Sequence, residues 1–249
     1  MRLEWRAASA AGVLDLLLPR ACVVCDRLLD VGDRRLACGR CWARVRELPQ
    51  PRCARCGNPN LREACAWCEN LPPFVRAARS FCWIPGGTGG QIVHALKYGG
   101  WRAAGEEMGA VMARLDWPAD VVRERSAVVP VPLARDRERE RGYNQSAELA
   151  RALARRWNVP LWDDVVERTR ATATQTRLTP EERRGNVSGA FRARAGARDR
   201  LHGTHPVLVD DVITTGATLA ACAAALFEGG ARIISLVTFG RAPAIGDRV

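Results

Sequence analysis

Two adjacent carboxylates, Asp210 and Asp211, stand between an apolar run and a turn rich in threonine and glycine. Residues 207–209 before them are apolar and rich in valine, as in a buried parallel strand. An Ala- and Leu-rich helical stretch follows the turn, which comprises Thr214, Thr215, Gly216, Ala217 and Thr218. A strand, a tight turn and a helix in this order gather backbone N–H groups and the positive end of a helix dipole at one point. That arrangement suits a phosphate.

The paired carboxylates do not suit the same phosphate, because like charges repel. They suit sugar hydroxyls, a metal ion or a developing cation. A ligand that carries both a phosphate and a polyol therefore fits, and 5-phosphoribosyl pyrophosphate is such a ligand. The pattern GxxxxGK[ST] is absent and no GxGxxG follows a strand, which disfavours nucleoside-triphosphate and dinucleotide sites. The alternative is an ordinary strand–turn–helix unit with an acidic pair.

Eight of the ten cysteines form four CxxC pairs, a spacing that lets two thiolates turn towards one tetrahedral Zn²⁺. The pairs are Cys22/Cys25, Cys38/Cys41, Cys53/Cys56 and Cys65/Cys68. Sequential pairing is favoured because each half then closes a short loop, although spacing alone leaves a cross-braced pairing open. Two structural zinc ions would staple a segment too small to bury its own core. A disulfide scaffold, a redox CxxC and an iron–sulfur cluster are less consistent with four regular pairs.

Other side chains in the cysteine-rich segment can be interpreted in two ways. Arginines lie among the cysteines, where they either offset the charge of a Cys₄ zinc site or face nucleic-acid phosphates. They include Arg27, Arg40, Arg44, Arg52 and Arg55. Trp42 and Trp67 either cover the zinc sites, which we favour, or stack on bases. Cys82 and Cys222 lie in apolar surroundings and are expected to be core residues.

Further anion-binding candidates lie upstream of the carboxylates. Arg141 and Asn144 stand at the start of a helix expected over residues 144–157, where an anion would meet free N–H groups. Lys97 is the one lysine among 38 basic residues. The long polar stretch over residues 168–191 is either a lid that would exclude water or an exposed helical hairpin.

Composition limits the class of protein. The hydrophobic content of 47% supports a packed core, and the formal charge of +11 would fall if eight thiolates held two zinc ions. No apolar run approaches the ~18 residues that a membrane span needs. Glu4 and Asp15 argue against a signal peptide at the N-terminus, so residues 1–20 are expected to form a packing helix. We therefore expect a cytoplasmic protein.

The rest of the sequence predicts the strands and helices that would hold the carboxylates and the turn in place. Strands are expected near residues 79–84, 127–131, 165–166, 207–209 and 232–239, and helices near 92–98, 103–115 and 144–157. Glycines 86, 87, 89 and 90 are expected to form a flexible turn. Strands that alternate with helices predict an α/β fold with a parallel sheet covered on both faces. Ligands bind at the carboxyl ends of such strands, where Asp210 and Asp211 fall.

The whole pattern resembles the ComF family, the competence protein F group of phosphoribosyltransferase-like proteins. The resemblance rests on the four CxxC pairs, then HALKYGG, then RGYNQSAELA, then QTRLTPEERRGNVSGAF, then VLVDDVITTGAT. It implies a parallel-sheet type I phosphoribosyltransferase domain over residues 74–242. It also implies a double zinc-ribbon module over 21–71, between the packing helix and that domain, and leaves a tail over 243–249.

The resemblance also implies roles for individual residues. Asp210 and Asp211 would recognise the ribose, the turn at 214–218 the 5′-phosphate, and the eight paired cysteines two zinc ions. Lys97 and Arg141 would stabilise the pyrophosphate that leaves, together with Mg²⁺. Further members of the site or its lid would be Asn144, Gln175, Arg183 and Asn186.

The family resemblance implies a link to DNA uptake in natural transformation, with single-stranded DNA and a helicase-like protein as partners. Two functions stay open at this point. One is an enzyme that transfers a phosphoribosyl group from Mg²⁺-phosphoribosyl pyrophosphate. The other is a non-catalytic adaptor for DNA or a partner protein that uses the zinc module and keeps the phosphate pocket as a ligand sensor. The chain also resembles amidophosphoribosyltransferases in its sheet domain, but it lacks their glutaminase half, so glutamine-dependent amination is not expected.

Overall fold

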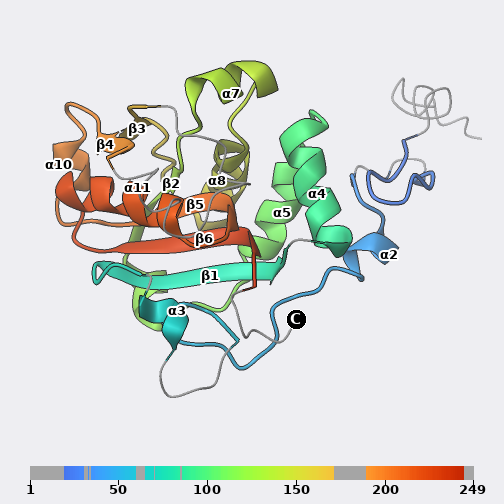
Figure 1. The fold of residues 1–249 in the computed structure, drawn as a ribbon, viewed down its shortest axis with the longest axis horizontal. Coiled ribbons are helices and arrows are strands. Elements are labelled where there is room, and N and C mark those ends of the chain that lie inside the picture. Colours follow the sequence, from blue (N-terminus) through green and yellow to red (C-terminus); the bar gives the residue numbers. More distant parts are fainter. Residues whose placement is uncertain are drawn as a thin grey trace, which may run out of the picture.

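The core of the protein is a four-stranded, all-parallel sheet with the strand order β1-β6-β5-β2. The computed structural model describes residues 20–30, 33, 35–59, 65–69, 71–84, 86–170 and 189–243. The strands are β1 (Val75–Trp83), β2 (Arg125–Pro130), β5 (His205–Ile213) and β6 (Ile234–Arg241). Figure 1 shows these strands stacked at the centre, with helices on both sides. The predicted parallel α/β fold is therefore confirmed.

Side chains that alternate along each strand build two separate hydrophobic cores. On β5, Val207 and Val209 join one core, whereas Leu208 joins the other. The first core is covered by α4 (Gly87–Tyr98), α5 (Ala104–Met112) and α8 (Gln145–Trp157). The second is covered mainly by α11 (Ala217–Glu228). Both faces of the sheet are thus covered, so its strands are buried along most of their length.

An asparagine lies at each end of helix α8. Asn144 caps its first turn, because the side-chain Oδ1 accepts a hydrogen bond from Ser146 N at 3.0 Å. Asn158 ends it in the left-handed conformation, with φ at 52°. On α5, a Cβ atom at Gly109 would collide with Ala152, so this glycine lets the two helices pack closely.

The glycine-rich segment after β1 differs from its prediction. It was expected as a turn, but α4 already begins at Gly87. Gly86 and Gly87, with φ at 98° and 58°, both have the positive φ that glycine adopts without strain, where the chain enters the helix. Gly89 is buried, and a Cβ atom there would lie 3.0 Å from Cys82 Sγ. The small residues therefore allow the first turn of the helix to approach the sheet.

A second, two-stranded antiparallel sheet lies beside the main one. It pairs β3 (Val166–Arg168) with β4 (Phe191–Ala193), so the strand expected near 165–166 forms there and not in the main sheet. Thr169 N donates to Ala190 O at 2.9 Å, which brings together the two ends of the predicted lid. Residues 171–188 of that lid, including Gln175, Arg183 and Asn186, lie outside the described residues.

The remaining helices are short: α2 (Gly39–Trp42), α3 (Ala66–Glu69), α6 (Ala119–Glu124), α7 (Arg135–Arg141) and α10 (Arg198–Leu201). No residue of α7 is buried. The packing helix expected over 1–20 lies outside the described residues except for Arg20, and so does the tail after residue 243. Within the described ranges, none of the helices combines the length and apolar character that a membrane span requires.

Candidate functional site

A cavity of about 380 Å³ lies at the carboxyl ends of β2 and β5, between α4, α7, α8 and the first turn of α11. Its position agrees with the rule for parallel sheets. The two adjacent carboxylates line it, as do Lys97 and most of the threonine turn. Its other polar and aromatic lining residues are Tyr98, Arg137, Gln145, Ser146 and Arg168.

The two carboxylates are buried and each has a fixed partner. Lys97 Nζ lies 2.6 Å from Asp211 Oδ2. Ser146 Oγ donates to Asp210 Oδ1 at 2.7 Å, and the backbone N–H of Asp211 donates to the same oxygen at 2.9 Å. Burial raises the pKa of Asp210 to about 7, and the adjacent Asp211 carboxylate acts in the same direction. Burial disfavours the charged form of Lys97, but the two carboxylates outweigh it and raise the pKa of the ammonium.

The turn between β5 and α11 lines the cavity. Gly216 is the N-cap residue of α11 and has φ at 82°, a conformation that glycine adopts without strain. Thr214, Gly216, Ala217 and Thr218 line the cavity. Thr215 does not, and its Oγ1 accepts a hydrogen bond from Ala217 N at 3.4 Å. The first N–H groups of a helix have no acceptor within the helix, so this end of α11 can donate to an anion.

Arg141 and Asn144 do not line the cavity but contact residues that do. The Arg141 guanidinium lies 5.1 Å from the centroid of the Tyr98 ring, and its Nη1 donates to Gln145 Oε1 at 2.5 Å. Asn144 caps α8, and its Nδ2 donates to Val131 O at 3.0 Å. Both side chains therefore hold residues that face the cavity.

Sequence reasoning missed Ser146, Gln145, Arg137 and Arg168 as cavity residues. Gln145 and Ser146 lie in the first turn of α8, close after the predicted candidates Arg141 and Asn144. The reasoning that predicted an anion site at the start of this helix applies to them as well. Arg168 was treated only as the start of the lid, and its place at the end of β3 puts it at the cavity.

The eight paired cysteines form two clusters, each with Sγ atoms within 4.8 Å of one another. One cluster contains Cys22, Cys25, Cys38 and Cys41, and the other Cys53, Cys56, Cys65 and Cys68. Measured Sγ–Sγ distances are 3.9 Å in the first cluster and 3.5 and 3.3 Å in the second. The edge of a zinc–thiolate tetrahedron is about 3.8 Å. Both clusters thus fit a zinc ion, and the predicted sequential pairing is confirmed.

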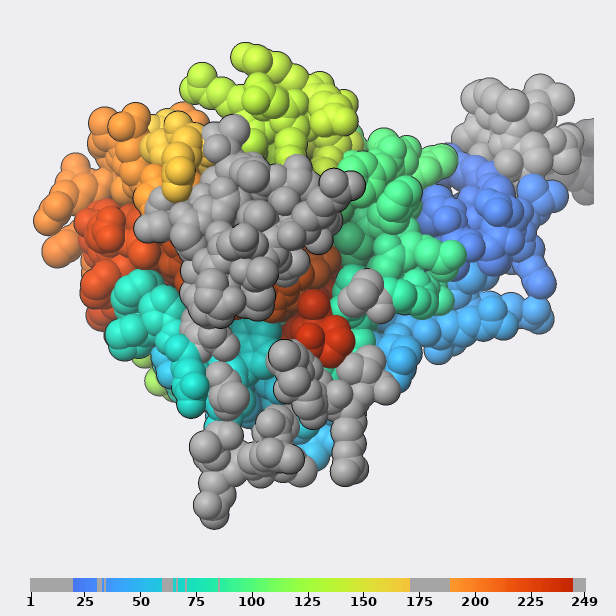
Figure 2. All heavy atoms as spheres, viewed as in Figure 1, coloured from blue at the N-terminus to red at the C-terminus, as the bar shows by residue number. Residues whose placement is uncertain are grey.

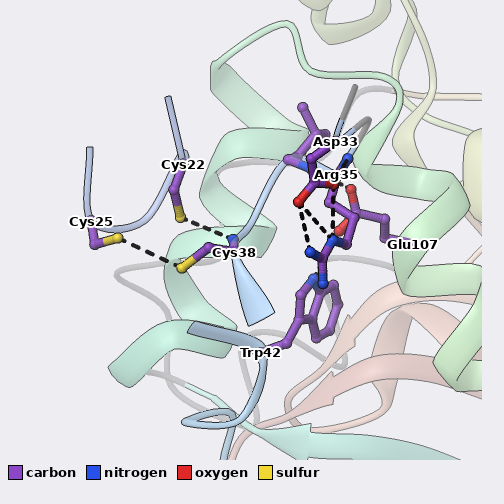
Figure 3. Close-up of polar contacts among 8 residues, drawn as sticks. Cys22, Cys25, Asp33, Arg35, Cys38, Trp42 and Glu107 are labelled. Atoms are coloured by element: carbon purple, nitrogen blue, oxygen red, sulfur yellow. Dashed lines mark hydrogen bonds and ion pairs between the residues drawn. The ribbon is translucent and has the colours of Figure 1, made fainter. Parts of the chain in front are cut away.

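The first Cys₄ site docks on α5 through Glu107 (Figure 3). The carboxylate of Glu107 accepts hydrogen bonds from Leu36 N and, at 2.8 Å, from Trp42 Nε1. Cys38 N donates to Cys22 Sγ at 3.2 Å, which helps to orient that thiolate. In Figures 1 and 2 the blue segment around this site lies at the right-hand edge of the molecule, beside α4.

The second Cys₄ site lies at the opposite face of the sheet, where Figure 1 shows α3 below β1. Arg55 Nη2 donates to Leu71 O at 3.1 Å and to Pro72 O at 3.0 Å, so this arginine ties the end of the site together. Trp67 is only 5% exposed and belongs to the same hydrophobic core as Cys56, so it offers no surface for base stacking. Cys82 and Cys222 are fully buried, as expected of core residues.

Comparisons with known proteins match both parts of the chain. A double zinc ribbon domain model matches residues 13–72, and a phosphoribosyl transferase domain model matches residues 143–246. DNA utilization protein YhgH of Escherichia coli strain K12 is 32% identical over 233 residues, which cover 89% of this chain and 96% of that protein. Competence protein F of Haemophilus influenzae is 41% identical over 93 residues, or 37% of this chain and 40% of that protein.

Among solved structures, the glutamine phosphoribosylpyrophosphate amidotransferase from B. subtilis is 19% identical to this chain. The match covers 55% of this chain and 26% of that one, with a TM-score of 0.37. This likeness is too weak to bear on function.

Proposed function

Because the chain belongs to the ComF family of phosphoribosyltransferase-domain proteins, we propose that its cavity binds Mg²⁺-phosphoribosyl pyrophosphate or a similar sugar phosphate. One observation carries this proposal. The carboxylates of Asp210 and Asp211 and the first turn of α11 line the same cavity. A phosphate and a polyol of one ligand can therefore be bound at once, each by the group that suits it.

Each part of the ligand has a candidate partner. Asp210 and Asp211 would accept hydrogen bonds from the ribose hydroxyls, and the turn at 214–218 would donate to the 5′-phosphate. Lys97 already stands at the carboxylates, 2.6 Å from Asp211, and can offset negative charge on a leaving pyrophosphate. Arg141 can contribute through Tyr98 and Gln145, which it contacts. When bound, Mg²⁺ would neutralise pyrophosphate charge.

The test is calorimetric titration of zinc-loaded protein with Mg²⁺-phosphoribosyl pyrophosphate. The double variant Asp210→Asn/Asp211→Asn should lose at least ~100-fold in affinity, because it replaces two carboxyl groups with amides, which are weaker acceptors. The chain holds a matched control, the exposed adjacent pair Asp163 and Asp164. The same double change there should leave binding unchanged. Equal affinity in both double variants would refute the proposal.

A role in DNA handling is the second candidate, and the names of the two relatives support it. In this version the protein is an adaptor that binds single-stranded DNA or a helicase-like partner, with the cavity as a ligand sensor. The formal charge of +11 favours binding to polyanions. Affinity for a single-stranded oligonucleotide should fall steeply as salt rises. Binding that is absent, or does not respond to salt, would contradict direct contact with DNA.

A further inference from the structure

One side chain, Trp67, connects the second Cys₄ site to the turn at 214–218, which we call the phosphate turn. Trp67 lies between the ligands Cys65 and Cys68, and the residue is 5% exposed. A Cβ atom at Gly216 would lie 3.6 Å from Trp67 Cζ3, which is van der Waals distance. The indole therefore lies close to the glycine that opens α11. Trp67 and Ile213, the residue at the end of β5, belong to the same hydrophobic core.

The indole is fixed by a buried arginine at the end of β6. Arg241 Cζ lies 4.4 Å from the centroid of the Trp67 ring, and the whole residue is 0% exposed. Its Nη2 donates to the carbonyl of the zinc ligand Cys56, and its Nε donates to Ser80 Oγ at 3.4 Å. A cation over a ring is worth more when water is excluded. Arg241 thus joins the zinc site, the indole and the sheet into one packed unit.

The first Cys₄ site has a tryptophan in a comparable place but no such connection. Trp42 follows the ligand Cys41, donates to Glu107 and packs edge-on against Phe239 at a centroid distance of 6.1 Å. These contacts belong to the core on the other face of the sheet. Neither Cys₄ site contributes a described residue to the lining of the cavity, and the difference between them is that Trp67 of the second site lies close to Gly216.

We propose that Trp67 is a positioning residue that couples the second zinc site to the shape of the phosphate turn. Zinc in that site holds the indole in place, and the indole holds Gly216 and the first N–H groups of α11 in the geometry that a phosphate needs. Pre-ordered donors bind an anion more tightly than donors that must first be ordered. The affinity part of this inference rests on the proposed function, whereas the coupling itself does not.

The experiment compares Trp67→Ala with the matched control Trp42→Ala, each shown by metal analysis to retain two zinc ions. Hydrogen–deuterium exchange is followed in the peptide that covers residues 214–220, without ligand. Trp67→Ala should speed exchange there, while Trp42→Ala should leave it unchanged. Exchange in the peptide that covers α4 should stay the same in both variants, which distinguishes local loosening from general destabilisation.

Titration with Mg²⁺-phosphoribosyl pyrophosphate supplies the second readout. Trp67→Ala should bind about tenfold more weakly than the natural protein, and Trp42→Ala equally well. If the natural protein does not bind, the proposed function fails but the exchange comparison still tests the coupling. If Trp67→Ala does not fold, Trp67→Leu keeps a buried apolar side chain and should show the same changes. A folded, fully zinc-loaded Trp67 variant with unchanged exchange at 214–220 would overturn the inference.

Discussion

The two Cys₄ sites share their ligand type and the CxxC spacing within each pair, yet they are attached to the protein in opposite ways. The first is held by a carboxylate, Glu107, that accepts hydrogen bonds from its backbone and its tryptophan. The second is held by guanidinium groups, since Arg55 and Arg241 donate to its carbonyls. One site packs on the helices of one face of the sheet, and the other lies on the opposite face, where its Trp67 is close to Gly216. Two Cys₄ sites with the same type of ligand can therefore differ in position: the first lies away from the cavity, and the second lies near it.

Removing one zinc ion at a time gives the largest expected effect. Cys22→Ser and Cys56→Ser each replace a fully buried ligand, one in each site. Each should lose one zinc ion per chain and more than about 4 kcal/mol of unfolding free energy, because metal binding contributes to folding. Metal analysis and calorimetric unfolding measure this. Only Cys56→Ser should also loosen the peptide at 214–220, and equal loosening in both variants would erase the contrast between the sites.

Removing the buried guanidinium of the second site comes next. Arg241→Met should lower the unfolding free energy by about 2–4 kcal/mol, since it deletes charged hydrogen bonds and a cation over a ring. The control is Arg40→Met on α2, an exposed arginine in the first site, which should change stability by less than about 0.5 kcal/mol. Chemical denaturation measures both. Equal effects of the two variants would show that Arg241 does not attach the second Cys₄ site to the rest of the protein.

The pH dependence of the unfolding free energy tests whether Asp210 affects stability independently of the two zinc sites. Asp210 has a pKa of about 7 in the folded protein, above its usual value of 3.8. The folded state therefore keeps a proton that the unfolded state has lost. Stability from this group is present at low pH and disappears as pH rises towards 7, by at most ~1.4 kcal/mol per pH unit.

Asp210→Asn should remove this slope when unfolding free energy is measured between pH 6 and 7, where zinc ligation is best retained. The exposed Asp164→Asn should keep it. A slope that survives in Asp210→Asn would assign the pH dependence to other groups, the zinc thiolates among them.

The smallest expected effect concerns the carboxylate that holds the first site. Glu107→Gln leaves an amide group facing one of two N–H donors and should lower the unfolding free energy by about 1–2 kcal/mol. Glu106→Gln is the control, because that residue pairs with Arg155 and Arg156 at the surface and should contribute less than ~1 kcal/mol. Denaturation measures stability, and sugar-phosphate affinity should not change in either variant. Weaker binding in Glu107→Gln would mean that the first site also acts on the cavity.

The sequence by itself determined the features that depend on neighbours along the chain. Four CxxC pairs define two Cys₄ sites, because two intervening residues bring thiolates to one metal and short loops favour sequential pairing. The apolar run, the carboxylates and the glycine at 216 define a strand, a turn and a helix, because each is set by local backbone preference. The alternation of such units also predicts a parallel sheet with its site at the strand ends.

Only the tertiary structure decided which distant residues meet. Ser146 reaches Asp210 from 64 positions away, and Glu107 reaches Trp42 from 65. Trp67 lies close to Gly216, and the two zinc sites fall on opposite faces of the sheet. These contacts follow from the strand order, in which β6 and β5 insert between β1 and β2. No local pattern encodes that order, because it depends on how whole faces of strands and helices bury one another.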